Sequence, residues 1–572
     1  MKLRKLQTKN IVQIVLLVFA CILLGFAIRS CANADTQDEF VVLSTADMNG
    51  KIWYKDVQTG EDEPNNLLAA SSAIKDARAG FEDRTITYDN GDLYQNSLIE
   101  SLNLNEKNTD IVKGVQPCTL AMDEMKYDGY TLGNHEFNYK YSLLQTNYEY
   151  IKDRTTLVSA NIYDKATGQR LFTPYITKTF KVDGNFFKVG IIGLDNPDCS
   201  LWDASSHFSN IQFYASDNPN ADLAYEIKKV QDEMAIADEN CDFVIVSMHN
   251  GFYFENELQH TNFTQNTQNM LDERAEEPLE LGVNTEAQAY RAIKNTTGID
   301  MFICGHDKND NYSNMKFPNA DGSKDVLVVN AASTALTKTV FRANYDKNNH
   351  VYNVSVKSSE NVPLASYGPD SVLTSRVRDD IQMTINKFAY VPGEIMGNWD
   401  IIDNETDYYT YQTDYADFIN RAQMWAGYTW SKTLKKPVED INLKLRADNG
   451  QNTKLQFKGP TITPDMSITS IPPDADKKIK NGQFTFQDAK KAYPEDHYLC
   501  SVAVTGEEIK EMLEYNAAVK YRVELDDYNN KKIVVSGDYR SLPITYGLNF
   551  HINMNKPVGQ RVIIQGFSNG RE

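Results

Sequence analysis

The sequence contains few cysteines, and they show none of the spacings that bind zinc or catalyse disulfide exchange. Two of the seven, Cys21 and Cys31, lie in the first 34 residues, and no CxxC pair occurs anywhere. An odd number remains after residue 34, so complete disulfide pairing within that part of the chain is excluded. We therefore expect neither a disulfide framework nor thiol catalysis.

Basic residues are also scarce relative to acidic ones. The chain has 58 Lys and Arg against 78 Asp and Glu, a formal net charge of −20. A nucleic-acid polymer needs a basic surface, so it is not expected as a partner. A small phosphate ester held by metal ions remains compatible, because the ions supply positive charge locally. We find no internal repeat and no low-complexity tract.

Acidic residues are absent from the first 34 residues, which contain five basic ones. An apolar run extends from Ile11 to Ile28, and Ala32-Asn33-Ala34 follows it. This layout is typical of a signal peptide, and an uncleaved N-terminal membrane anchor is the alternative. Both interpretations of residues 1–34 predict an exported protein, located extracellularly, at the cell surface or in the periplasm. Any membrane contact is expected only through this anchor.

The rest of the chain alternates apolar runs with helix-like stretches, which is typical of a layered α/β fold. We expect a first domain at 35–365, a connector at 366–395 and a second α/β domain at 396–572. The connector contains a helix predicted at 370–389. Expected strands in the first domain include 40–43, 85–88, 157–160, 186–192, 243–246, 301–304 and 326–329, and expected helices include 221–234 and 285–296. In the second domain we expect helices at 408–425, 485–493 and 506–515 and a strand at 499–504.

Five short polar motifs each follow one of the apolar runs of the first domain. In α/β domains ligands gather where strands end at their carboxyl edge, so these motifs are expected to converge. They are Asp47-Met48-Asn49-Gly50, Gly91-Asp92, Gly133-Asn134-His135-Glu136, His249 and Gly305-His306-Asp307-Lys308.

The residue types in these motifs indicate a two-metal centre that cleaves phosphate esters. Asp92 follows a strand and a glycine, and is the expected bridge between the metals; Asp47 would bind the first metal. The predicted ligands of the second metal, besides Asp92, are Asn134, His249 and His306. Alone, a Gly-Asp pair is more often a turn and a strand-end histidine more often structural. The combination favours the metal centre.

His135 is the predicted catalytic acid or transition-state donor, and Asn138 is expected to orient its ring. The expected cofactor is a divalent metal, namely Mn, Zn, Fe, Mg or Ca. The expected ligand is a nucleotide or another small phosphate ester, and the oligomeric state is left open.

These segments resemble the calcineurin-like metallophosphoesterases of the 5'-nucleotidase and 2',3'-cyclic-nucleotide 2'-phosphodiesterase/3'-nucleotidase family. The matching stretches of the first domain are STADMNGKIWYKD, YDNGDLYQNS, LGNHEFNY, SMHNGF and ICGHDK. The second domain resembles the family through residues 485–514 and 552–562. The resemblance implies a four-layer metallophosphoesterase domain followed by a 5'-nucleotidase-type C-terminal α/β domain that binds the nucleotide. The branch of cyclic-nucleotide phosphodiesterases fits better, because Asn138 stands where 5'-nucleotidases usually have Asp.

The sequence departs from the family pattern at three places. Asn49 stands where the family has a histidine ligand, and Lys308 where it has His or Gln. Both positions belong to the first metal, and an ammonium offers only donors, so one metal is expected to be held firmly and the second weakly or not at all. The family also usually continues beyond the position of Glu572, so the second domain is expected to be incomplete at its end. Tyr493 and Phe550 are its candidate substrate-binding aromatics.

These observations predict an exported metal-dependent phosphohydrolase of nucleotides, acting on 2',3'-cyclic, 3' or 5' phosphoesters, with a degraded first metal site. The principal alternative is a family member that binds a nucleotide or phosphate ligand without efficient hydrolysis. A scaffold or adhesion role with a vestigial site is the third.

Overall fold

In the computed structural model, most of the first two-thirds of the chain is described. The described residues there are 38–57, 60–94, 115–139, 141–202, 207–208, 210–218, 220–252, 265–307 and 311–388. Those beyond are 393–395, 414–433, 445–446, 452–453, 466–469, 482–484, 489, 499, 504–519, 521–525, 529–535 and 544–568. The predicted leader, Lys308 and Tyr493 lie outside these ranges. None of the helices among the described residues is long and apolar enough to cross a membrane.

The chain divides into two compact units, residues 1–385 and 386–572. The first unit contains two mixed six-stranded sheets. The first sheet has the order β14-β13-β1-β2-β3-β4, in which β1 to β4 are parallel and β13 runs antiparallel to both its neighbours. Its strands are β1 (Glu39–Thr45), β2 (Thr85–Asp89), β3 (Gly129–Tyr130), β4 (Thr156–Leu157), β13 (Ala335–Asp346) and β14 (Val351–Pro363).

The second sheet has the order β11-β12-β10-β9-β7-β6. Its four central strands are parallel, and the two edge strands are antiparallel to their neighbours. The strands are β6 (Tyr175–Val182), β7 (Asn185–Leu194), β9 (Phe243–Met248), β10 (Met301–Cys304), β11 (Tyr312–Pro318) and β12 (Asp325–Asn330). A short pair, β5 (Tyr163–Asp164) and β8 (Ile211–Gln212), lies outside both sheets.

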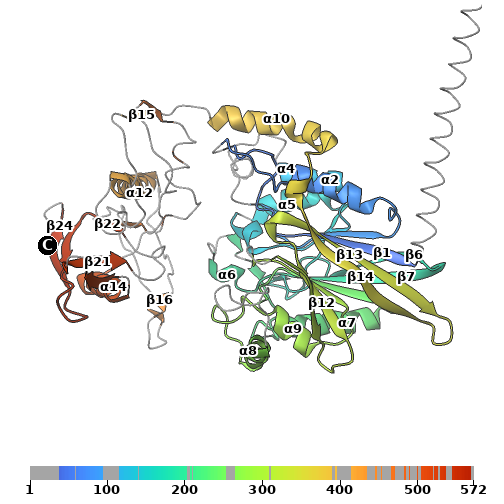
Figure 1. Cartoon of the computed structure of the whole chain (residues 1–572). Helices are drawn as coiled ribbons and strands as arrows, with labels where there is room; N and C mark the ends of the chain where they lie inside the picture. The colour runs from blue at the N-terminus through green and yellow to red at the C-terminus, as the bar shows by residue number, and fades with distance from the viewer. Residues whose placement is uncertain are drawn as a thin grey trace, which may run out of the picture. The chain divides into compact units, whose positions relative to one another are not determined.

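Helices cover the outer face of each sheet, so the unit has four layers (Figure 1). Side chains of α2 (Leu67–Arg78), α4 (Pro117–Met125), α5 (Tyr141–Ile151) and α10 (Ser371–Phe388) share one core with the first sheet. The second sheet shares its outer core with α7 (Leu223–Ile236), α8 (Gln265–Glu276) and α9 (Ala289–Asn295). The helix predicted in the connector is thus α10, and it packs in the core of the first unit.

The layer between the sheets is rich in aromatic rings. Phe40 of β1 stacks on Phe341 of β13, and it also contacts Phe187 and Phe243 of the second sheet. Alternate residues of a strand face opposite sides, which explains why neighbouring Phe186 and Phe187 of β7 are 73% and 0% exposed. The predicted four-layer α/β fold is confirmed.

One helix predicted from the sequence is wrong at its start. The apolar spacing predicted a helix from residue 285, but α9 begins at Ala289. Thr285, Glu286 and Gln288 instead use their side chains to contact Asp198, His306 and the backbone of Leu223. Polar side chains that find partners outside the helix compete with helix formation.

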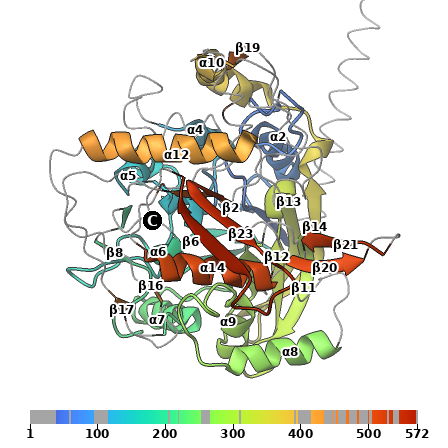
Figure 2. The same cartoon turned by 90° about the vertical axis from the view of Figure 1, so that its left-hand side faces the viewer.

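Among its described residues the second unit has two longer helices and paired short strands (Figure 2). Helix α14 (Gly506–Val519) packs on strands β23 (Leu548–Ile552) and β24 (Val562–Phe567) through Ile509, Leu513, Leu548 and Val562. Helix α12 spans Asp414–Thr433. The remaining strand pairs are β15 (Gly393–Ile395) with β19 (Gly482–Phe484), β16 (Leu445–Arg446) with β17 (Asn452–Thr453), β18 (Ser467–Thr469) with β22 (Ile544–Tyr546), and β20 (Tyr521–Leu525) with β21 (Lys531–Val535).

Replacing Phe187 by Ala should destabilise the first unit by about 3–5 kcal/mol, because it removes a fully buried ring from between the sheets. The matched change Phe186→Ala removes an exposed ring from the same strand and should cost less than about 0.5 kcal/mol. Urea unfolding followed by circular dichroism measures both. Equal losses of stability in the two variants would contradict the position of the inter-sheet core.

Candidate metal centre

The polar motifs meet at the carboxyl ends of the parallel strands of both sheets. Asp47, Asp92 and the turn η2 (Asn134–Phe137) follow β1, β2 and β3 of the first sheet. His249 and His306 follow β9 and β10 of the second sheet. Because both sheets point these ends to the same place, residues far apart in sequence come together, as the motif positions predicted.

Asp47, Asp92 and His249 lie at the centre of this cluster of polar side chains. All three are fully buried, and one ligand atom of each lies within 4.8 Å of those of the other two. His249 Nε2 lies 3.3 Å from Asp92 Oδ1, while the Nδ1 atom of the same ring contacts the Asn90 carbonyl at 2.9 Å. The contact to the carbonyl leaves Nε2 facing the two carboxylates, which is the arrangement of a metal-binding histidine.

The charge of the two carboxylates acts strongly on the buried imidazole. Burial alone would lower the pKa of His249, but the attraction of Asp92, assisted by Asp47 and Glu136, outweighs it and raises this pKa to about 10. The same negative field attracts a divalent cation, which would replace the proton. Two carboxylates and an imidazole form a donor set that suits Zn, Mn or Fe, so these residues fit a metal ion.

The prediction assigned Asp47 to the first metal and His249 to the second. In the structure one ligand atom of Asp47 and one of His249 lie within 4.8 Å of each other, so the two residues face the same space. The division of ligands between two metals remains a prediction.

Four non-glycine residues of these motifs have backbone angles in the left-handed region. The φ angles are 56° for Asp47, 46° for Asn49, 55° for Asp92 and 73° for His306. Non-glycine residues are uncommon there and the conformation costs free energy, so its repetition in three of the converging motifs is typical of a functional site.

Glu136 holds the turn that carries Asp92, a role that the sequence did not reveal. Its carboxylate accepts hydrogen bonds from the backbone N–H groups of Asp92 at 3.0 Å, Leu93 at 2.7 Å and Tyr94 at 3.1 Å. It also accepts one from Gly133 at 2.6 Å. Burial, and next the charge of Asp92, raise the pKa of the Glu136 carboxyl above its usual value. The only signal in the sequence was its place in the Gly-Asn-His-Glu motif.

Glycine is required where the Asp92 turn meets η2. A Cβ atom on Gly133 would lie 2.2 Å from Asp92 Oδ1, and one on Gly91 would lie 2.5 Å from the backbone nitrogen of Gly133. Both distances are far below van der Waals contact. The two glycines therefore allow the β2 and β3 loops to approach closely.

His135 lies at the edge of the cluster, with its side chain 19% exposed. Its Nε2 atom is 3.6 Å from Asp92 Oδ2, and its backbone N–H donates to Asp92 Oδ1 at 2.9 Å. The other ring nitrogen, Nδ1, contacts Asn138 Oδ1 at 2.8 Å. Asn138 therefore contacts His135 as the sequence analysis expected, while the catalytic roles of both remain predictions.

Asn134 and His306 contact each other next to the cluster. The His306 Nδ1 atom is 2.9 Å from Asn134 Oδ1, and the His306 backbone N–H donates to Asp47 Oδ2 at 3.2 Å. Two further residues surround the His306 ring. Glu286 Oε1 lies 2.8 Å from its Nε2, and the indole of Trp202 stacks on it with centroids 5.4 Å apart. The sequence analysis gave no role to Glu286 or Trp202.

Asn49 is buried in the turn after β1. Its side-chain amide donates to the Asp47 carbonyl at 2.6 Å, and its backbone N–H donates to the Asp92 carbonyl at 2.8 Å. The amide nitrogen thus stabilises the turn that presents Asp47. Lys308, the second position that departs from the family pattern, lies outside the described residues.

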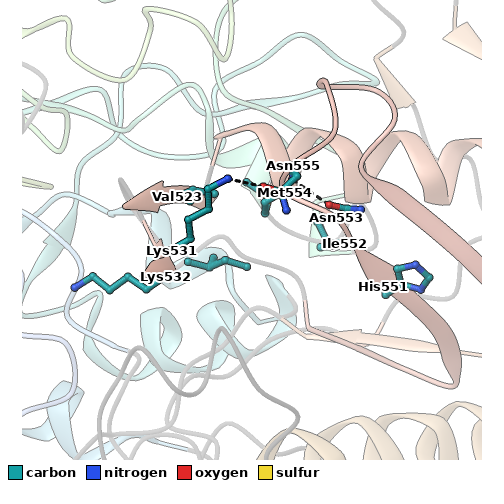
Figure 3. A pocket seen from close by; sticks show the side chains of 9 residues that line it. Val523, Lys531, Lys532, His551, Ile552, Asn553, Met554 and Asn555 are labelled. Atoms are coloured by element: carbon teal, nitrogen blue, oxygen red, sulfur yellow. Dashed lines mark hydrogen bonds between the residues drawn. The ribbon is translucent and has the colours of Figure 1, made fainter. Parts of the chain in front are cut away.

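In the second unit, Phe550 packs beside the cluster of Ile509, Leu513, Leu548 and Val562. A pocket of about 370 Å³ lies nearby, and its lining residues do not include Phe550 (Figure 3). The lining contains Lys531, whose Nζ donates to Asn555 Oδ1 at 3.1 Å, and none of the described lining residues is acidic. The other lining residues are Val523, Lys532, Ile533, His551, Ile552, Asn553 and Met554. The substrate-binding roles of Phe550 and of Tyr493, which is not described, remain predictions.

Four of the seven cysteines lie among the described residues. Cys118, Cys199, Cys241 and Cys304 are free. Burial raises the pKa of Cys241 to about 11 and that of Cys304 to about 12, which disfavours a reactive thiolate.

Comparison with known proteins supports the resemblance seen in the sequence. The family model described as the 5'-nucleotidase C-terminal domain matches residues 398–571. Over 242 residues the chain is 31% identical to the 2',3'-cyclic-nucleotide 2'-phosphodiesterase/3'-nucleotidase of Salmonella typhimurium, a match covering 41% of this chain and 35% of that relative. The protein of the same description from Haemophilus influenzae is 22% identical over 556 residues, covering 92% of this chain and 74% of that relative.

A solved structure extends the likeness to the fold. A Staphylococcus aureus protein assigned as a 5'-nucleotidase, in complex with alpha-ketoglutarate, superimposes with a TM-score of 0.62 at 19% identity. The superposition covers 92% of this chain and 86% of that one. At this identity the superposition shows a shared fold. The sequence matches identify the chain as a member of the 5'-nucleotidase and 2',3'-cyclic-nucleotide phosphodiesterase family, calcineurin-like phosphoesterases with a 5'-nucleotidase C-terminal domain.

Proposed function

We propose that this protein is a metal-dependent phosphohydrolase of nucleotides, acting on 2',3'-cyclic, 3' or 5' phosphoesters. The observation that carries the proposal is the buried group of Asp47, Asp92 and His249 with His135 at its edge. The relatives described as 2',3'-cyclic-nucleotide 2'-phosphodiesterase/3'-nucleotidases supply the substrate class. The match covers only 35% of the Salmonella relative, so the activity and the substrate of this chain are themselves proposed.

The metal-binding residues and His135 would have different roles in hydrolysis. Asp47, Asp92 and His249 would hold a divalent cation, which when bound neutralises charge on phosphoryl oxygens and promotes ionisation of water. His135 stands 3.6 Å from Asp92 at the more exposed side of the group, where a leaving oxygen would accept its proton. Asn138 holds the other nitrogen of that ring at 2.8 Å and so fixes its direction.

We also propose that the first metal site is degraded. Asn49 directs its amide nitrogen to the backbone of Asp47, and an amide oxygen is a weaker ligand than imidazole. Lys308 would bring an ammonium group, which donates hydrogen bonds and repels cations. Losing one metal of a pair removes several kcal/mol of transition-state stabilisation, so the turnover should be slow.

Replacing His135 by Ala should lower kcat for 2',3'-cyclic AMP by about 10²–10⁴-fold, since it removes the proposed general acid. Hydrolysis of 2',3'-cyclic AMP and of bis-p-nitrophenyl phosphate in Mn²⁺ measures the effect. The control His350→Asn changes an exposed histidine of the first unit and should leave kcat unchanged. Absence of hydrolysis in the parent protein, with nucleotides still raising its Tm, would support the alternative of a binding protein without efficient hydrolysis.

The degraded-site proposal predicts one firmly bound metal per chain. Elemental analysis after Mn²⁺ loading should give about one equivalent for the parent protein and about two for the double variant Asn49→His, Lys308→His. Each single variant serves as a control, because one restored histidine supplies only half of the missing ligands. Two equivalents in the parent protein, or no gain of metal or activity in the double variant, would contradict the proposal.

A further inference from the structure

We propose that Glu286 is a positioning residue of the metal centre, holding the His306 ring through a carboxylate–imidazole hydrogen bond. This inference rests on the proposed metal-dependent function, but it concerns how tightly the centre binds its cation. Neither the motifs nor the comparisons assign Glu286 a role.

Contacts hold the His306 ring on three sides. Its Nε2 atom lies 2.8 Å from Glu286 Oε1, and its Nδ1 atom lies 2.9 Å from Asn134 Oδ1. The indole of Trp202 stacks almost parallel on the ring, with an interplanar angle of 6°. With Nε2 donating to Glu286, Nδ1 is the nitrogen left to share a cation with Asn134, its predicted fellow ligand.

The segment that carries Glu286 is itself fixed to the loop after β9. The Glu286 carbonyl accepts from the backbone N–H of Gly251 at 2.9 Å. The neighbouring Thr285 carbonyl accepts from the Asn250 side-chain amide at 3.0 Å, and the Gln288 backbone N–H donates to the same Asn250. Since Asn250 directly follows His249, these hydrogen bonds fix the position of the Glu286 segment relative to the buried group of Asp47, Asp92 and His249.

A second anchor joins this segment to the loop that carries Trp202. The Thr285 hydroxyl donates to Asp198 Oδ1, and the backbone N–H of Gly282 donates to the same oxygen. Asp198 immediately precedes the short helix α6 (Cys199–Trp202). The segments that carry Glu286 and Trp202 are thus joined by a buried hydrogen bond from Thr285 and a partly buried one from Gly282.

The contact between Glu286 and His306 contributes little to the stability of the fold. The Glu286 side chain is 44% exposed, and exposed ion pairs typically contribute less than about 1 kcal/mol. A carboxylate that accepts from a ligating histidine instead fixes the orientation and the tautomer of the ring, and removing such a partner typically costs about 10–100-fold in metal affinity. The geometry therefore points to metal binding as the property that Glu286 serves.

The test is a calorimetric titration of the metal-free full chain with Mn²⁺. Glu286→Gln keeps the size of the side chain and removes its charge, and should weaken Mn²⁺ binding by about tenfold. Glu286→Ala removes the hydrogen bond as well and should weaken it by up to about 100-fold. Glu286→Asp should recover part of the loss. Glu277→Gln removes an exposed carboxylate from the same connection between α8 and α9 and should bind Mn²⁺ as the parent does.

Unchanged Tm values of the metal-free variants would show that the affinity loss is not a folding defect. Mn²⁺ affinity of Glu286→Gln and Glu286→Ala equal to that of the parent would overturn the inference while leaving the proposed function intact. The parent protein could hydrolyse no phosphoester while Mn²⁺ affinity still decreases from the parent to Glu286→Gln and further to Glu286→Ala. That result would overturn the proposed function and support the role of Glu286. Absence of Mn²⁺ binding in the parent would overturn both.

Discussion

The attraction between the buried His249 imidazole and the carboxylates of Asp92 and Asp47 is the interaction on which the metal centre depends. Three polar groups with no exposed surface need strong mutual interaction to remain buried. In the protein without metal the carboxylates favour a proton on His249, because their attraction raises the pKa of this imidazole against the opposing effect of burial. The same surroundings favour a divalent cation, so what stabilises the buried group also prepares it for a metal.

The fold and the strained turns hold this group together against electrostatic repulsion. Parallel strands of two sheets end at one edge, and Glu136 binds four backbone N–H groups around the Asp92 turn. Gly91 and Gly133 have no side chain to keep the two loops apart. The positive φ angles of Asp47 and Asp92 cost free energy that the surrounding hydrogen bonds and core must offset. Rigid support of this kind fixes the direction of the ligands before a cation arrives.

The sequence predicts the parts of the site that are local. Buried parallel strands appear as apolar runs, and the residue after each run is polar, which identified Asp47, Asp92 and His249. Glu136 and Glu286 act on residues 44 and 20 positions away, so no local pattern reveals them. The start of α9 was wrong for the same reason, because long-range partners draw Thr285 and Glu286 out of the helical spacing. Fold class followed from alternating patterns, whereas the contacts that orient the ligands depend on tertiary packing.

The central claim is that Asp47, Asp92 and His249 together hold a divalent cation. The most direct measurement is a crystal structure of the full chain loaded with Mn²⁺, with anomalous diffraction collected on both sides of the manganese absorption edge. The account predicts an edge-dependent peak within coordination distance of Asp47, Asp92 and His249. A peak confined to surface carboxylates, with none between these residues, would contradict it.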